Sequence, residues 1–109
     1  LLDQVLGNLI DNALKFSGPG GRVAARAAPA GTGVAVTVED DGPGIVPADL
    51  PRIFDPFFRA TRTDRIAAGS GLGLAIAHGL TRAMGGRITA HSPTADGHGT
   101  RLELLFRAP

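Results

Sequence analysis

Glycine-rich clusters interrupt this chain of 109 residues at four points. The first, residues 17–21, ends a stretch with apolar residues at helical spacing, and the second, residues 40–44, follows a run of alternating valines. The third, residues 69–73, opens another helical stretch, which ends at the fourth, Gly85-Gly86. Because glycine and proline terminate helices and strands and favour turns, the sequence predicts short helices and strands joined by turns.

The segments between these clusters alternate between helical and strand periodicity. Apolar residues recur at helical spacing in the first segment, and apolar and other residues alternate on both sides of a turn at residues 29–33, as in a β-hairpin. The predicted elements are helices at residues 1–16, 47–53 and 71–84 and strands at residues 23–27, 34–38, 88–91 and 101–106. This mixture predicts one α/β domain, a two-layer sandwich with a mixed, mainly antiparallel sheet covered on one face by helices.

Composition excludes several classes of function. Eleven basic residues against ten acidic ones leave a net charge of +1, which gives no electrostatic footprint for nucleic acid or for direct contact with an anionic membrane. The absence of cysteine excludes thiolate nucleophiles and cysteine zinc sites. No apolar run approaches the ~20 residues of a membrane span, so we expect a soluble domain. Lys15, the only lysine, stands between Leu14 and Phe16, which excludes a P-loop.

Two stripes run along the first predicted helix. The apolar stripe, which we expect to face the core, comprises Leu2, Val5, Leu6, Leu9, Ala13 and Phe16. The polar stripe comprises Gln4, Asn8, Asp11, Asn12 and Lys15. A solvated face is one interpretation of the polar stripe. The other starts from asparagine being a mediocre helix former: two asparagines four residues apart, followed by a lysine, suit oxygen ligands to Mg²⁺ beside a phosphate-facing ammonium.

The Asp-Asp-Gly-Pro-Gly-Ile segment at residues 40–45 directly follows a predicted strand. Asp, Gly and Pro are the usual residues of a tight turn, and a turn is the simpler interpretation. The functional interpretation uses the same flexibility, because glycines let the backbone approach a flat ligand while a carboxylate accepts a hydrogen bond from its exocyclic amine. The sequence alone leaves both interpretations open.

The third glycine cluster and the segment before it carry further candidates. Three glycines at a helix start expose unpaired N–H groups, which predicts an anion site at residues 69–73; a flexible hinge is the alternative. Residues 55–70 show no periodicity, which is typical of a functional or mobile segment. We expect Phe54 and Phe57 to form a small apolar core beneath it. Arg59 is either a phosphate-binding guanidinium or a solvated surface residue.

Each of these features is ambiguous alone, but together their order resembles a known family. The asparagine helix, the Asp-x-Gly-x-Gly turn, the Phe-rich segment and the Gly-x-Gly-x-Gly helix start are similar to the asparagine, first glycine, phenylalanine and second glycine boxes of sensor histidine kinases. The resemblance covers nearly all 109 residues and is to the catalytic ATP-binding domain, in the superfamily shared with DNA gyrase, heat-shock chaperone and mismatch-repair ATPases. It implies a Bergerat-type fold that binds Mg-ATP and transfers the γ-phosphate to a histidine.

The resemblance also implies a role for individual residues. Asn12 would coordinate Mg²⁺, and the groups acting on the phosphates during transfer would be Asn8, Lys15 and Arg59. The adenine or its sugar would contact Phe16, while the adenine amino group would donate to Asp40. The base pocket would be shaped by Gly42, Gly44, Ile45 and Thr100. Backbone N–H groups for the phosphates would come from Gly69, Ser70, Gly71, Leu72 and Gly73.

The acceptor histidine is expected outside these residues. His78, His91 and His98 do not match the acceptor contexts of the family, so we interpret them as surface or packing residues. The first helix begins at residue 1 without a capping residue, so we expect an N-terminally truncated catalytic domain over residues 1–109. The expected partners are the dimerisation and histidine phosphotransfer domain of the parent kinase and, indirectly, a response regulator. We expect a cytoplasmic domain; the sequence leaves open whether the parent is anchored in the inner membrane.

The first helix also separates two branches of the superfamily. Hydrolytic members carry Glu-x-x-x-Asn at the similar place, whereas this chain has Asn8-x-x-x-Asn12. Because an amide is not a general base, we expect poor ATP hydrolysis and transfer to a docked histidine instead. Asp11 as a substitute base would favour a hydrolytic ATPase, and an ATP-binding module without transferase activity is the other alternative.

Overall fold

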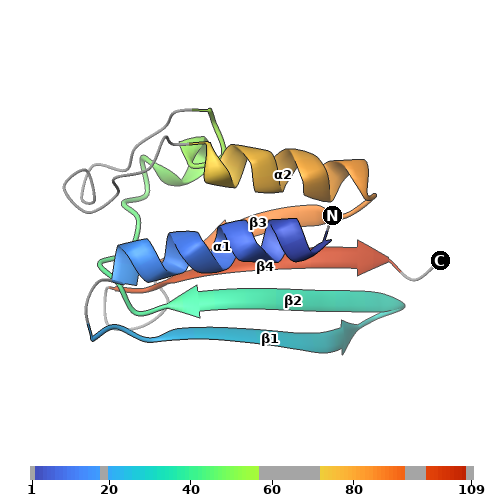
Figure 1. Cartoon of the computed structure of the whole chain (residues 1–109), viewed down its shortest axis with the longest axis horizontal. Coiled ribbons are helices and arrows are strands. Elements are labelled where there is room, and N and C mark those ends of the chain that lie inside the picture. Colours follow the sequence, from blue (N-terminus) through green and yellow to red (C-terminus); the bar gives the residue numbers. More distant parts are fainter. Residues whose placement is uncertain (1, 18–19, 57–71, 93–97, 108–109) are drawn as a thin grey trace.

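The structure is a computed structural model that describes residues 2–17, 20–56, 72–92 and 98–107. Figure 1 shows two helices lying over one face of a four-stranded sheet. The elements, in chain order, are α1 (Leu2–Ser17), β1 (Val23–Ala30), β2 (Gly33–Asp40), the 3-10 helix η1 (Leu50–Arg52), α2 (Gly73–Ala83), β3 (Arg87–His91) and β4 (Thr100–Arg107). The predicted two-layer α/β sandwich is therefore confirmed.

The strand order is β1-β2-β4-β3, and all three pairings between the described strands are antiparallel. The hairpin of β1 and β2 turns at Gly31 and Thr32, where Gly31 has a φ of 60°. A positive φ is common for glycine and uncommon for other residues, which explains the glycine in this turn. The pairing of β2 with β4 places Asp40 directly opposite Thr100 at one end of the sheet.

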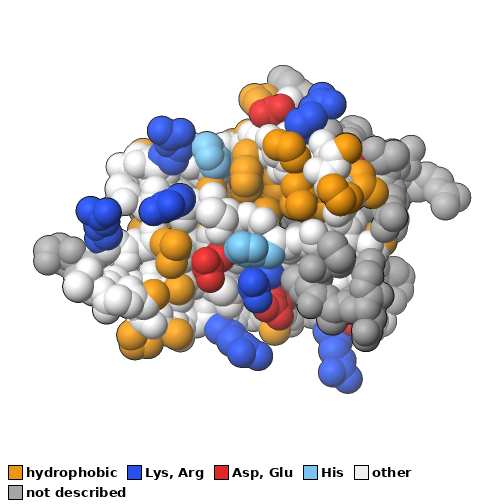
Figure 2. Space-filling view, turned by 180° about the vertical axis from the view of Figure 1, so that it is seen from behind, with side chains coloured by type: hydrophobic (Ala, Val, Ile, Leu, Met, Phe, Trp, Pro, Cys, Tyr) orange, Lys and Arg blue, Asp and Glu red, His pale blue; other side chains and the backbone are white. Residues whose placement is uncertain are grey.

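The two faces of the sheet differ in chemistry because successive side chains of a strand point to opposite sides. The helix-covered face carries buried apolar residues, such as Val38 and Leu104. Figure 2 shows the molecule from the opposite side, where basic and acidic side chains lie on the face that the helices leave uncovered. There Arg101 and Glu39 approach within 3.6 Å, across β4 and β2.

The core lies between the helices and the sheet and takes residues from both layers. The buried apolar residues are Val5, Leu9 and Ala13 of α1, Ala77 of α2, Val38, Ile88, Leu102 and Leu104 of the sheet, and Ile53. Most of the apolar stripe predicted on the first helix therefore faces the core. Leu2 does not: its exposed fraction is 42%, because the first turn of α1 extends beyond the buried cluster. The side chain of Phe16 lies outside the part of the chain that the structure describes.

Two leucines of α1 give a direct test of this packing. We expect Leu9→Ala to lower the free energy of unfolding by about 2–5 kcal/mol, because Leu9 is fully buried and its truncation leaves a cavity. Leu14→Ala is the matched control, since Leu14 lies on the same helix with 56% of its surface exposed. Its effect should stay within about 0.5 kcal/mol. Chemical denaturation of the two variants measures both values, and equal losses would contradict the assignment of the core face.

Candidate nucleotide-binding site

Predicted site residues from several elements gather at one end of the molecule. The C-terminal half of α1, the end of β2 and the beginning of β4 lie together at the left-hand end in Figure 1. β3 ends at the same side, because it runs antiparallel to β4. This juxtaposition brings the asparagine helix and the Asp-x-Gly-x-Gly turn, which are separate in the sequence, to the same end of the sheet.

The turn at residues 40–45 is held by hydrogen bonds at both of its ends. Asp40 is the last residue of β2, and its Oδ1 accepts a hydrogen bond of 2.9 Å from the backbone N–H of Gly42. The carbonyl of Gly42 in turn accepts a bond of 2.8 Å from the N–H of Gly99, immediately before β4. The turn is thus a continuation of the β2–β4 pairing, and the Asp40 carboxylate contributes to its shape.

Ser92 fastens the far end of the same turn, a role that the sequence analysis missed. Its Oγ accepts a hydrogen bond of 2.7 Å from the N–H of Ile45 and donates one of 2.7 Å to the carbonyl of Gly99. A third contact, of 3.3 Å, joins Ser92 Oγ to Thr100 Oγ1. The available signal was positional: Ser92 continues the period-two pattern of Ile88 and Ala90, so it belongs on the helix-covered face.

Gly44 sits where only glycine fits without strain. Its φ is 83°, and a Cβ at this position would lie 3.1 Å from Ser92 Oγ and 3.4 Å from the carbonyl oxygen of Gly99. Both the backbone conformation and the close approach therefore require glycine here. The turn is tight for a structural reason, and the base pocket predicted along it would have a rigid wall.

Asp40 is half-buried, and this burial raises the pKa of its carboxyl group above the ordinary value. The hydrogen bond from Gly42 acts in the opposite direction, and the negative charge of Asp41 raises the pKa further. Burial penalises the charged form because the surroundings solvate it less well than water does. Because the Asp40 carboxylate is partly desolvated, a ligand that donates a hydrogen bond to it would stabilise its charged form.

The polar stripe of α1 divides into an exposed and a half-buried part. Gln4, Asp11 and Lys15 are exposed, whereas Asn8 and Asn12 are half-buried. Neither asparagine side chain forms a hydrogen bond with another residue in the described part of the chain. In the same part, no group of three or more His, Cys, Asp or Glu residues could hold a metal. The carboxamide oxygens of Asn8 and Asn12 are available as ligands for a cation.

The structure describes the glycine-rich helix start at residues 69–73 only from Leu72 onwards. Leu72 is half-buried and its carbonyl accepts the first helical hydrogen bond, of 2.9 Å, from Ile76. Gly73 is exposed, and a Cβ on it would meet no atom within 4 Å. The N–H groups of this first turn have no acceptor within the helix. Four predicted residues, Arg59, Gly69, Ser70 and Gly71, lie outside the described residues, as does the side chain of Phe16.

The Phe-rich segment is joined to α2 by an aromatic contact. Phe54 and His78 stack with ring centroids 5.0 Å apart and an interplanar angle of 25°. Phe54 is half-buried and packs against the core cluster, as expected, while Phe57 lies outside the described residues. His78 is thus a packing residue, and His91 and His98 are exposed. This agrees with the interpretation of all three as surface or packing residues.

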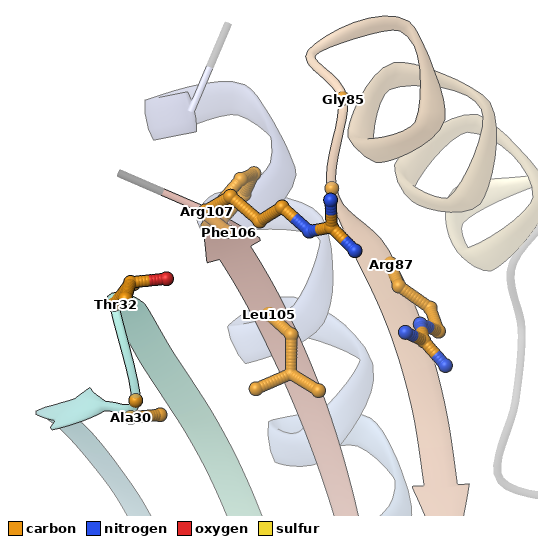
Figure 3. A pocket seen from close by; sticks show the side chains of 10 residues that line it. Ala30, Thr32, Gly85, Arg87, Leu105, Phe106 and Arg107 are labelled. Atoms are coloured by element: carbon orange, nitrogen blue, oxygen red, sulfur yellow. The ribbon is translucent and has the colours of Figure 1, made fainter. Parts of the chain in front are cut away.

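A hollow lies at the opposite end of the sheet. Figure 3 shows it between the β1–β2 turn, the α2–β3 turn and the end of β4, with Arg87 and Arg107 beside it. Its other lining residues are Ala30, Gly31, Thr32, Gly33, Gly85, Gly86, Leu105 and Phe106. It contains none of the predicted site residues, so it is a separate feature from the candidate nucleotide site.

The chain belongs to the histidine kinase-, DNA gyrase B- and HSP90-like ATPase family, whose model matches residues 1–109. Among curated relatives, Sensor histidine kinase Hik2 of Thermosynechococcus vestitus is 39% identical over 106 residues. Sensor protein RstB of Escherichia coli is 40% identical over 107 residues. Each alignment covers 97% of this chain but only 28% and 24% of the two relatives. The chain thus spans about a quarter of the length of these relatives.

Solved structures give the same result. The Mycobacterial sensor histidine kinase MprB superimposes with a TM-score of 0.87 at 35% identity, over 99% of this chain and 74% of that one. Full-length ShkA in complex with AMPPNP matches with a TM-score of 0.79 at 34% identity, over 95% of this chain and 20% of that one. The resemblance to histidine kinase catalytic domains is therefore confirmed. No helix in the described ranges is long and apolar enough to cross a bilayer.

The raised pKa of Asp40 predicts how stability depends on pH. The folded protein binds the Asp40 proton more tightly than the unfolded chain does, so ionisation of Asp40 costs stability as the pH rises through its folded pKa. We expect Asp40→Asn to unfold at a higher denaturant concentration than the parent at neutral pH, because the amide oxygen can still accept from Gly42 without the charge. This advantage should vanish below the ordinary pKa of a carboxyl group.

Unfolding midpoints across pH measure this difference. Asp41→Asn is the control, since Asp41 is exposed and accepts a hydrogen bond from the N–H of Arg22. An Asp40→Asn variant that is less stable than the parent at neutral pH would contradict the assigned burial cost.

Proposed function

We propose that this domain binds Mg-ATP at the end of the sheet formed by Asp40 and Thr100 and transfers the γ-phosphoryl group to a histidine on a separate phosphoacceptor domain. The observation that carries the proposal is the convergence of the base-side turn and the asparagine face of α1 at one end of the molecule. Membership of the ATPase family supports the choice of nucleotide. ShkA, a structural neighbour, is in complex with AMPPNP, an analogue of ATP.

The base side of the proposed site depends on one free carboxylate oxygen. Gly42 donates to Oδ1 of Asp40, and no described residue donates to Oδ2. The exocyclic amine of adenine donates two hydrogen bonds, so Oδ2 is a suitable acceptor for one of them. Gly42, Gly44 and Ile45 would form the adjoining wall, and Thr100 lies directly across from Asp40. Phe16 would complete the pocket from α1.

The phosphate side would use the asparagine face of α1. Magnesium in proteins keeps near-octahedral oxygen coordination, with few protein ligands and the rest from phosphates and water. The half-buried Asn12 and Asn8 lie four residues apart on one face, and their carboxamides have no other partner among the described residues, which fits this requirement. Asn12 would hold the ion, and Asn8 and Lys15 would contact the phosphates. Bound Mg²⁺ would supply neutralisation of the triphosphate charge.

The remaining phosphate contacts would come from the start of α2 and the segment before it. Backbone N–H groups at a helix N-terminus form a suitable anion site, and the open space around Gly73 leaves room for a phosphate. Gly69, Ser70, Gly71 and Leu72 would contribute to the same site, and Arg59 would approach the terminal phosphate. Phosphoryl transfer requires positioning and charge neutralisation more than covalent help from the protein, which this set provides.

The expected outcome of the reaction depends on Asn8, which stands in α1 where hydrolytic members of the superfamily carry a glutamate. Asn8 cannot activate water as a glutamate can, so transfer is favoured over hydrolysis. The acceptor would be a histidine of the dimerisation and phosphotransfer domain of the parent kinase, with a response regulator downstream. The names of the curated relatives, which are sensor proteins about four times longer than this chain, support this arrangement. We place the domain in the cytoplasm, where ATP is present.

Calorimetry tests the binding step. We expect the parent chain to bind Mg-ATP and Asp40→Asn to bind it at least about tenfold more weakly, because a hydrogen bond to a charged group contributes about 1.5–3 kcal/mol. Asp41→Asn should bind like the parent, since Asp41 is bonded to Arg22 instead. Equal affinities for the parent and Asp40→Asn would remove Asp40 from the proposed site.

A transfer assay with labelled ATP and an added phosphoacceptor domain tests the catalytic step. We expect phosphohistidine with little free phosphate, and slower transfer by Gly73→Ala, whose added methyl group would occupy the space proposed for a phosphate. Gly79→Ala is the matched control, because Gly79 lies on the same helix and a Cβ there also meets nothing within 4 Å. Both variants should fold, since alanine favours helix. Release of free phosphate without phosphohistidine would show a hydrolytic enzyme instead.

A further inference from the structure

The Ser92 hydroxyl joins three segments around the base side of the site: the turn at Ile45, the residue before β4 and Thr100 at the start of β4. We propose that Ser92 is a positioning residue that fixes the hydrogen-bonding direction of Thr100, so that the pocket offers only acceptors and selects a purine with an exocyclic amine. This inference rests on the proposed function and concerns the discrimination of adenine from a keto purine.

The direction of each hydrogen bond follows from an inventory of protons. A serine hydroxyl has one proton to donate and two lone pairs that accept. The carbonyl of Gly99 can only accept, so the 2.7 Å contact with it uses the single proton of Ser92. The N–H of Ile45 can only donate, so its 2.7 Å contact uses one lone pair. In the remaining contact, of 3.3 Å, Thr100 must therefore be the donor.

This assignment determines what Thr100 presents to a ligand. With its proton directed to Ser92, the Thr100 hydroxyl has only lone pairs left for another partner. Thr100 lies directly opposite Asp40, and opposed residues of antiparallel strands have Cβ atoms about 4.5–5.5 Å apart. Asp40 Oδ2 and Thr100 Oγ1 are thus two neighbouring acceptors. An amine, which donates, satisfies them, whereas a keto oxygen in its place would face them with a third acceptor.

Burial increases the energetic cost of leaving the acceptors of Asp40 and Thr100 without a donor. Thr100 is 8% exposed and Asp40 is half-buried, so neither group is fully solvated when a ligand lies against it. A site built to pair with a donating group rejects an analogue that lacks the donor, because its own polar groups are then left without partners. Without the Ser92 oxygen, the Thr100 hydroxyl could rotate and donate to a keto group. The N–H of Ile45 would also lose its acceptor.

The test compares ATP with inosine triphosphate, which carries a keto oxygen where ATP carries the amine. We expect the parent chain to prefer ATP by at least about tenfold in affinity. In Ser92→Ala this ratio should fall about threefold or more, through tighter inosine triphosphate binding relative to ATP. Because the ratio is taken within one variant, it does not depend on the fraction of protein that is folded. Ser92→Thr, which keeps the hydroxyl, should restore the preference.

Thr89→Ala is the matched control, since Thr89 carries a hydroxyl in β3, the strand that Ser92 follows, but on the opposite face of the sheet. It should leave the ratio at the parent value. An unchanged ratio in Ser92→Ala would overturn the inference while leaving the proposed function intact. If the parent chain binds neither nucleotide, the proposed function itself fails, and the two failures are therefore distinguishable.

Discussion

The pairing of β2 with β4 is the constraint on which the proposed base side of the site depends. It runs for the full length of both strands and ends with Asp40 opposite Thr100. Beyond that row, Gly99 donates to the carbonyl of Gly42, so the pairing extends into the turn that follows β2. A carboxylate, a hydroxyl and a glycine-rich turn from segments 60 residues apart in the sequence are thereby fixed relative to one another. The hydrogen bonds of the sheet thus hold the residues proposed for the base pocket in fixed relative positions.

α1 connects this end of the sheet to the proposed phosphate side, because one of its faces packs in the core and the other carries the two asparagines. Val5, Leu9 and Ala13 are buried against the sheet, which fixes the rotation of the helix about its axis. That rotation brings Asn8 and Asn12 to a half-buried position instead of a fully solvated one. This arrangement costs stability, because Asp40 is partly desolvated and neither carboxamide is hydrogen-bonded to a residue in the described part of the chain.

Periodicity and turn chemistry were sufficient to predict most of the fold from the sequence. The helical spacing of apolar residues identified α1 and α2, and the alternation of valines identified the hairpin, because these signals are local. The register between β2 and β4 is not a local property, so the sequence did not predict that Asp40 lies opposite Thr100; the resemblance to a family only implied that each of them lies near the adenine. Leu2 was assigned to the core stripe, but periodicity does not show where a helix passes the edge of the core.

The candidate site was predictable only in part, for a related reason. Asp40, Asn12 and the glycines stand in motifs whose residue types carry a chemical meaning, whereas Ser92 is a lone serine after a strand. Its three hydrogen bonds reach residues 7, 8 and 47 positions away, and no pattern within its own segment indicates them. The hollow beside Arg87 and Arg107 arises in the same way, from two turns and a strand end that meet only in the folded chain.

The central claim is that one end of the sheet binds both parts of Mg-ATP, and amide chemical shifts test it most directly. Saturating Mg-ATP should shift the amides of Asn12, Gly42 and Ile45 and leave those of Gly31 and Gly85, at the opposite end, unchanged. Shifts confined to the end with Gly31 and Gly85, or no shifts at all, would contradict the account.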